Sequence, residues 1–123
     1  MERLCFLMHL HEGREAEYEQ RHADLWPDMQ AALLDAGFTN YSLFRRGTLV
    51  VAYAECVPDA ATVLATIGDS EVNRRWGESF VDIIESMTDN SGELLTAREV
   101  WHLASSDAPA PQLRSSDRGS RSP

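Results

Sequence analysis

The stretch Tyr41-Ser-Leu-Phe-Arg-Arg-Gly-Thr-Leu-Val-Val-Ala-Tyr-Ala-Glu-Cys56 decides the fold of this chain. Two apolar runs, residues 41–44 and 49–56, flank Arg45-Arg46-Gly47, a sequence typical of a tight turn. The stretch therefore predicts two neighbouring antiparallel strands. Segments on either side of this hairpin supply the remaining elements.

The residues before the hairpin predict a strand followed by two helical segments. Residues 4–10 place apolar side chains on alternate positions, as in a half-buried strand. Residues 13–23 are rich in Glu and Arg, which favours a helix. Pro27 suits the first turn of a second helical segment, which Gly37 would end.

The residues after the hairpin predict two more helices and a last strand. Pro58 and Asp59 open a helix that ends near Gly68. Ser70 is a suitable N-cap for a longer helix to Met87, with the apolar side chains of Val72, Trp76, Phe80, Ile83 and Ile84 on one face. Residues 99–103 are the predicted final strand.

This order, β-α-β-β-α-β, indicates an α+β protein with the ferredoxin-like plan, an antiparallel sheet with helices on one face. The other sheet face is then uncovered. In residues 4–10 and 49–56, apolar side chains occur at odd-numbered and at even-numbered positions, and therefore on both faces of the sheet. The uncovered face is thus also expected to be buried. A second copy of the chain is the simplest cover, and we expect a homodimer.

The length of 123 residues fits one domain. We expect the folded domain to span residues 1–103. Residues 104–123 are rich in Ser, Pro and Arg and contain one large apolar residue, Leu113. Such a composition buries too little surface to offset the entropy of ordering, so this segment is predicted to be a disordered tail.

The charge balance excludes some classes of function. The chain has 20 acidic and 11 basic residues, a net charge of −9, which is unsuited to binding nucleic acid. It contains no Lys, which excludes Schiff-base and phosphate-loop lysine chemistry. No apolar run approaches the ~20 residues of a membrane helix, and the first residues do not resemble a signal peptide. We therefore expect a cytoplasmic protein without a membrane partner.

The cysteine and remaining histidine residues predict no cofactor chemistry. Cys5 and Cys56 lie within apolar runs and are predicted to be reduced core residues. His9 and His11 form only an i,i+2 pair without neighbouring thiols or carboxylates, and His102 is isolated. We therefore expect neither a metal nor any other cofactor.

One pair of residues has the spacing and the chemistry of a site. Tyr18 and His22 are four residues apart on a predicted helix, and therefore lie on the same face. An imidazole, with a pKa near 6.5, both takes and gives protons around neutrality, although such a pair is also common as a structural contact. Trp26, Tyr41 and Trp76 are either core aromatics or walls of a pocket. Aromatic rings beside one histidine suit a carbohydrate pocket.

A series of motifs runs through residues 1–103: the N-terminal strand, Tyr18, Arg21-His22, Trp26-Pro27, Asn40-Tyr41, Arg75-Trp76, Asp89-Asn90 and the closing Arg-Glu-Val-Trp-His-Leu. In this order and spacing, the motifs resemble those of the L-rhamnose mutarotase family. The resemblance implies a dimeric ferredoxin-like protein, of the dimeric α/β-barrel type. Its expected activity is the cofactor-independent interconversion of the α and β anomers of L-rhamnose, a small monosaccharide.

The resemblance also implies roles for individual residues. The family's proton donor falls on His22, and its sugar-binding residues fall on Tyr18, Tyr41 and Trp76. The chain departs from the family at Gly77, where a second Trp usually follows Trp76. The missing indole implies a wider or differently walled pocket, so L-fucose, another 6-deoxy-hexose, is the alternative substrate.

Anomer exchange needs only proton transfers. A base takes the proton of the anomeric hydroxyl, an acid protonates the ring oxygen, and the reverse transfers close the ring.

Two other classes of function stay open on the sequence. A dimeric α/β-barrel oxygenase or cyclase would have a largely apolar pocket, and a non-catalytic sugar-binding module would bind without needing His22.

Overall fold

The computed structural model describes residues 1–105, which form one antiparallel sheet and four helices. None of these helices is long and apolar enough to cross a membrane. In chain order the elements are β1 (Glu2–Leu10), α1 (Glu15–Ala23), α2 (Pro27–Ala36), β2 (Phe38–Arg46), β3 (Leu49–Cys56), α3 (Ala60–Gly68), α4 (Glu71–Glu78) and β4 (Ile84–Ser86).

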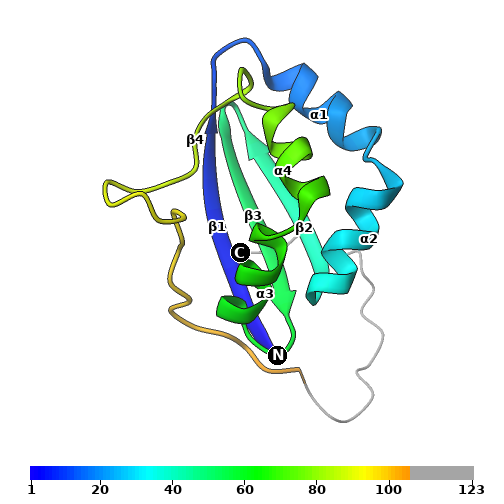
Figure 1. The fold of residues 1–123 in the computed structure, drawn as a ribbon. Helices are drawn as coiled ribbons and strands as arrows, with labels where there is room; N and C mark the ends of the chain where they lie inside the picture. The colour runs from blue at the N-terminus through cyan, green and yellow to red at the C-terminus, as the bar shows by residue number, and fades with distance from the viewer. Residues whose placement is uncertain (106–123) are drawn as a thin grey trace, which may run out of the picture.

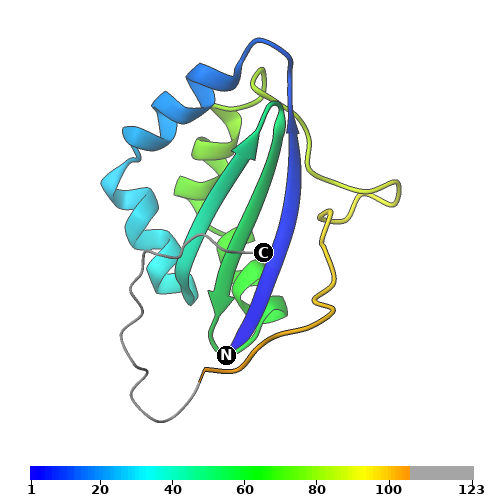
Figure 2. The same ribbon diagram turned by 180° about the vertical axis from the view of Figure 1, so that it is seen from behind.

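The sheet has the strand order β2-β3-β1-β4, and all neighbouring strands are antiparallel. All four helices lie on the same side of it (Figure 1). From behind, no described helix covers the other face (Figure 2). The predicted ferredoxin-like plan with helices on one face is therefore confirmed.

The hairpin that joins β2 and β3 forms as predicted, with a shorter turn. Arg46 pairs with Leu49, so only Gly47 and Thr48 lie in the turn, and Gly47 has a positive φ of 58°. Two-residue hairpin turns need positive φ, which glycine adopts without strain. Arg45 and Arg46 are strand residues, so their expected place in the turn was wrong.

The core lies between the sheet and the helices. Alternate residues of β1 and β3 point to this side and are buried, whereas the intervening residues remain partly exposed. This is the period-two pattern of a sheet with one buried face. The buried side chains are Leu4, Phe6, Met8, Leu10, Tyr18, Met29, Ala36, Phe38, Val50, Ala52, Ala54, Cys56, Val63, Ile67, Phe80 and Ile83.

A glycine ends α2 as the sequence predicts. Gly37 has a φ of 113°, a left-handed conformation that favours glycine. A Cβ at this position would lie 2.2 Å from the Val57 carbonyl oxygen, so the close approach also requires glycine. The Gly37 carbonyl accepts a hydrogen bond from the Val57 amide at 3.0 Å, which ties the end of α2 to the end of β3.

The predicted long helix from Ser70 to Met87 was wrong. Ser70 does cap α4, but the helix ends at Glu78. Successive turns then lead to β4, and their i→i+3 and i→i+4 hydrogen bonds keep Phe80 and Ile83 on the buried side. The apolar spacing therefore looked helical although the helix had ended. Ile84 instead pairs with Leu10 of β1, a role that suits a β-branched residue.

The predicted final strand at residues 99–103 was also wrong. The edge of β1 is occupied by β4 and then by residues 94–97, where the Leu7 amide donates to the Leu95 carbonyl (2.8 Å) and the Ala97 amide to the Cys5 carbonyl (2.9 Å). Residues 99–103 have no strand partner within residues 1–105. The Arg3 guanidinium donates to both carboxylate oxygens of Glu99 and holds this segment at its start. Of the predicted disordered tail, residues 106–123 lie outside the described residues.

Both cysteines have free thiols, as expected. Cys56 is buried beneath the helices. Cys5 is only half-buried because odd-numbered residues of β1 point to the uncovered sheet face, so its assignment to the core was wrong.

Two glycine-to-alanine variants should change stability in opposite directions. Gly77 lies in α4 with nothing within 4 Å of a built Cβ, so Gly77→Ala should raise the free energy of unfolding by about 0.5–1 kcal/mol. Gly37→Ala should lower it, because of the positive φ and the clash with Val57. Urea unfolding followed by circular dichroism measures both, and equal values for the two variants would contradict these packing assignments.

Candidate active site

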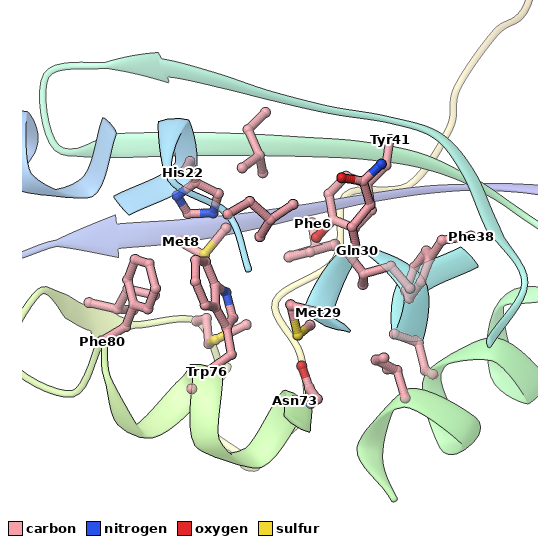
Figure 3. A pocket seen from close by; sticks show the side chains of 18 of the residues that line it. Phe6, Met8, His22, Met29, Gln30, Phe38, Tyr41, Asn73, Trp76 and Phe80 are labelled. Atoms are coloured by element: carbon pink, nitrogen blue, oxygen red, sulfur yellow. The ribbon is translucent and has the colours of Figure 1, made fainter. Parts of the chain in front are cut away.

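A cavity of about 610 Å³ lies between the sheet and the helices (Figure 3). Its walls come from both the sheet and the helical layer, and most of the lining side chains are apolar. The polar or titratable lining residues are Tyr18, His22, Gln30, Thr39, Asn40, Tyr41 and Asn73. The four residues predicted for the site, Tyr18, His22, Tyr41 and Trp76, all line this cavity.

The orientation of His22 follows from its hydrogen bond within α1. Nδ1 of His22 lies 3.0 Å from the backbone carbonyl oxygen of Tyr18. A carbonyl oxygen only accepts, so Nδ1 carries the hydrogen, and Nε2 of the neutral ring is the nitrogen with a free lone pair. Burial lowers the pKa of His22, and the bond to the carbonyl partly opposes this shift. Burial therefore favours the neutral imidazole, with Nε2 unprotonated.

Aromatic rings surround His22. The ring centroid of Tyr18 lies 4.5 Å away, that of Phe80 5.3 Å, and that of Trp76 5.5 Å, with the Trp76 ring nearly perpendicular. These rings come from α1, α4 and the turns that follow α4. They shield the imidazole from water, which explains why its charged form is disfavoured.

The hydroxyl of Tyr18 is buried and has no hydrogen-bond partner within residues 1–105. The predicted pairing with His22 therefore holds for the rings, but the hydrogen bond of His22 goes to the Tyr18 carbonyl and not to the phenol. Burial raises the pKa of Tyr18, so the hydroxyl stays protonated. An unsatisfied buried hydroxyl costs roughly 1–3 kcal/mol.

A β-bulge in β2 directs Tyr41 into the cavity. The register with β3 shifts between Thr39 and Ser42, and Asn40 adopts a positive φ of 48° there. The Asn40 side chain donates to Glu55 at 2.7 Å and anchors the bulge. Tyr41 then packs against Phe38, with ring centroids 5.2 Å apart, and burial raises its pKa to about 12. Such bulges are common beside active sites.

Trp76 separates two spaces. On one side it lines the main cavity beside Phe80, with ring centroids 4.8 Å apart. On the other side its ring contacts Trp26 at 5.0 Å, and both indoles line a smaller cleft of about 370 Å³. Trp26 does not line the main cavity, so it is a supporting contact for Trp76 and not a wall of the site.

Several lining residues were not predicted from the sequence. Gln30 on α2 and Asn73 on α4 add side-chain amides to the cavity. Asn73 stands one turn before Gly77, which also lines the cavity, so the helical spacing around Trp76 could have indicated it. No such spacing brings Gln30 to α4, because only the packing of α2 against α4 does so.

The other histidines are not part of this site. Within residues 1–105 no group of three or more His, Cys, Asp or Glu side chains is arranged to hold a metal ion. His9 and His11 are exposed at the end of β1. His102 lies 4.0 Å from Glu99 on the exposed C-terminal segment.

Comparisons with known proteins agree on one family. A family model described as L-rhamnose mutarotase matches residues 3–103. The L-rhamnose mutarotase of Listeria monocytogenes serotype 4b is 37% identical over 106 residues, which cover 85% of this chain and all of the relative. That of Lactiplantibacillus plantarum is 38% identical over 105 residues, covering 84% of this chain and 99% of the relative.

Two solved structures share the fold. The L-rhamnose mutarotase of Formosa agariphila superposes with a TM-score of 0.68 at 25% identity, covering 85% of this chain and all of the other. The tetracenomycin F2 cyclase of Streptomyces glaucescens, a type-II polyketide cyclase, gives a TM-score of 0.57 at 17% identity, covering 85% of this chain and 98% of the other. The second likeness concerns the fold alone.

His22 should titrate below the ordinary histidine value. Proton NMR of the ring Cε1–H, assigned by its loss in His22→Gln, should give a midpoint below 6.5 in the folded protein and near 6.5 in urea. Because the unfolded chain then binds the proton more tightly, the free energy of unfolding should fall as pH decreases from about 6.5 through the folded pKa. A folded midpoint at or above 6.5 would contradict the burial of the imidazole.

Proposed function

The chain belongs to the L-rhamnose mutarotase family, and on this premise we propose that it interconverts the α and β anomers of a 6-deoxy-hexose, with L-rhamnose as the first candidate. We assign the proton transfers to His22 and expect no cofactor to be needed. The members of this family are isomerases, so the general activity follows from membership. The sugar, the residues and the chemistry are the proposal.

One observation carries the assignment of His22. His22 lies in the cavity with its Nδ1–H donated to the Tyr18 carbonyl, and burial lowers its pKa; beside it is the Tyr18 hydroxyl, which has no partner within residues 1–105. A general base must be unprotonated at the operating pH and oriented within reach of its proton. His22 meets the first condition through burial and the second through its fixed ring.

The reaction needs one proton acceptor that later becomes a donor. Nε2 of His22 takes the proton of the anomeric hydroxyl while the bond between C1 and the ring oxygen breaks. The resulting imidazolium, stabilised through Nδ1–H by the Tyr18 carbonyl, protonates the ring oxygen. Rotation about C1–C2 presents the other face of the aldehyde, and the reverse transfers close the ring. General acid–base steps of this kind typically contribute ~10²–10⁴-fold.

The aromatic and polar lining suits a deoxy sugar. Trp76 and Phe80 offer ring faces and edges to the apolar side of a pyranose. The Tyr18 and Tyr41 hydroxyls remain protonated and can donate to sugar hydroxyls. The amide of Asn73 can both donate and accept.

The predominance of apolar lining residues is the property expected of a polyketide cyclase, the second candidate. The likeness to such a cyclase is confined to the fold, at 17% identity. The family match extends over residues 3–103 and names mutarotases. We therefore place mutarotase first, and the exchange assay below separates the two.

We also propose that the partner of this chain is a second copy, bound at the uncovered sheet face. Leu7, Val51 and Phe44 lie side by side across β1, β3 and β2 on that face. Phe44 is 61% exposed. At the adjoining C-terminal segment, Val100 and Trp101 are 89% and 75% exposed. Apolar side chains gathered on one face mark an association surface.

We place the protein in the cytoplasm. The free thiols of Cys5 and Cys56 suit a reducing compartment. Intracellular location also fits an isomerase that acts on a free sugar.

Replacing His22 should abolish most catalysis and leave the fold intact. Saturation-transfer proton NMR on equilibrated L-rhamnose and L-fucose measures anomer exchange directly. We expect His22→Asn to lower the enzymatic rate by ~10²-fold or more, because the general acid–base is lost. The matched control His11→Asn, at an exposed histidine outside both the cavity and the sheet, should exchange normally. A folded His22→Asn variant with near-normal exchange would disprove the assignment.

Removing the Tyr18 hydroxyl should separate binding from stability. Tyr18→Phe should raise KM for the sugar, because one donor to its hydroxyls is lost. The free energy of unfolding should stay equal or rise, because the hydroxyl is buried without a partner in residues 1–105. A clear loss of stability in Tyr18→Phe would show that the hydroxyl is satisfied within the folded protein.

The dimer should be detectable in solution. Sedimentation equilibrium at micromolar concentration should give about twice the 13.8 kDa of one chain. Phe44→Glu should shift the mass toward one chain by placing a charge on the proposed interface, whereas Val81→Glu, at a 70% exposed residue of the helical side, should not. A single-chain mass for the unaltered protein would contradict the proposal.

A further inference from the structure

The cavity extends beyond the residues proposed to hold the reacting sugar. Its volume of about 610 Å³ lies within the ~300–1,000 Å³ of pockets that bury drug-sized ligands. Figure 3 shows His22, Trp76 and Phe80 gathered toward one end and Phe38 at the other, with Tyr41 and Gln30 between them. The cavity therefore has a reactive end and a remote end.

The remote end is an apolar lobe. We use this name for the part of the cavity lined by Leu33, Phe38, Leu64 and Ile67. These side chains come from α2, β2 and α3, and Phe38 and Ile67 are buried in the core. None of these four side chains has a polar atom that could replace the bonds of a sugar hydroxyl to water.

Charge is excluded from the whole cavity. The chain carries a net charge of −9, yet none of the residues lining the cavity is Asp, Glu or Arg. A phosphate, carboxylate or ammonium group on the sugar would lose its hydration without an ionic partner. A group that fills the lobe must therefore be uncharged and apolar.

At the reactive end, beside Trp76, α4 leaves open space in the cavity. Gly77 lines the cavity one turn after Asn73, and a Cβ built on it meets nothing within 4 Å. Along α4, the Asn73 amide is followed one turn later by the open position at Gly77. A larger residue at position 77 would narrow the cavity.

The chemistry of anomer exchange restricts where the group can be attached. A substituent on O1 would make a locked acetal, which cannot open by proton transfer alone. With C1 at His22, the carbons across the pyranose ring, C4 and its neighbour C3, point away from the reactive end. We infer, on the basis of the proposed function, that the site also takes a reducing 6-deoxy-hexose bearing a short alkyl or acyl group on O3 or O4, in preference to the free sugar, and that the lobe binds this group.

A synthetic ether tests this inference. The kcat/KM for anomer exchange is measured by saturation-transfer NMR on L-rhamnose and on 4-O-butyl-L-rhamnose, whose ether bond resists hydrolysis. Each spontaneous rate, measured without protein, is subtracted. Burial of most of the butyl chain should raise kcat/KM at least about tenfold over the free sugar. An equal or lower value for the ether would overturn the inference while leaving the proposed function in place.

Variants locate the effect in the lobe. Leu64→Gln should reduce the preference for the ether about tenfold, because a polar amide replaces apolar surface there. The ratio of the two kcat/KM values, measured on one protein sample, does not depend on the fraction of protein that is folded. A destabilised variant therefore still gives a valid answer. Val81→Gln, an exposed substitution outside the cavity, should keep the ratio. An unchanged ratio in Leu64→Gln would overturn the assignment of the lobe.

Locked glycosides separate this inference from the proposed activity. Methyl 4-O-butyl-α-L-rhamnoside and methyl α-L-rhamnoside cannot exchange, and calorimetry measures their binding alone. The butyl compound should bind at least about tenfold more tightly. If no free sugar exchanges, the proposed function fails, but the two locked glycosides still test whether the lobe binds an alkyl group. Equal binding of both glycosides, or no binding of either, would overturn the assignment of the lobe.

Discussion

The antiparallel pairing of β1 with β3, and of β3 with β2, is the constraint on which the site depends. It aligns Phe6, Ala52 and Leu43 in one row across three strands, on the side that faces the helices. Phe6 and Leu43 line the cavity, whereas the small side chain of Ala52 between them is buried and does not. Because side chains alternate along a strand, a one-residue slip would turn this row to the other face and remove the floor of the cavity.

The helical layer gains its position from a few local features. Gly37 permits α2 to approach the end of β3, and Pro27 begins α2 at the point where α1 has ended. α1 and α4 thereby bring His22 and Trp76 together across the cavity. The imidazole of His22 is held by a hydrogen bond to the Tyr18 carbonyl, and burial among the rings around it lowers its pKa.

The two faces of the sheet differ in charge and in what covers them. The inner face, under the helices, has an uncharged cavity in a strongly acidic protein. The outer face carries apolar residues between charged ones, such as Phe44 beside Arg46. The same strands therefore supply the floor of the cavity on one side and exposed apolar side chains on the other, as alternation allows.

The sequence by itself determined the order of elements, the hairpin, the stop at Gly37 and the pairing of Tyr18 with His22, because each depends on neighbours a few residues apart. It predicted a helix up to Met87 because turns after Glu78 keep Phe80 and Ile83 at helical spacing, and only the pairing of Ile84 with β1 shows the strand. Tertiary structure alone decided that the Tyr18 hydroxyl has no partner within residues 1–105 and that a bulge turns Tyr41 inward. It also placed Trp26 outside the cavity and brought Gln30 and Asn73 into the same lining. These features arise from contacts between segments far apart in the chain, and such contacts leave no period in the sequence.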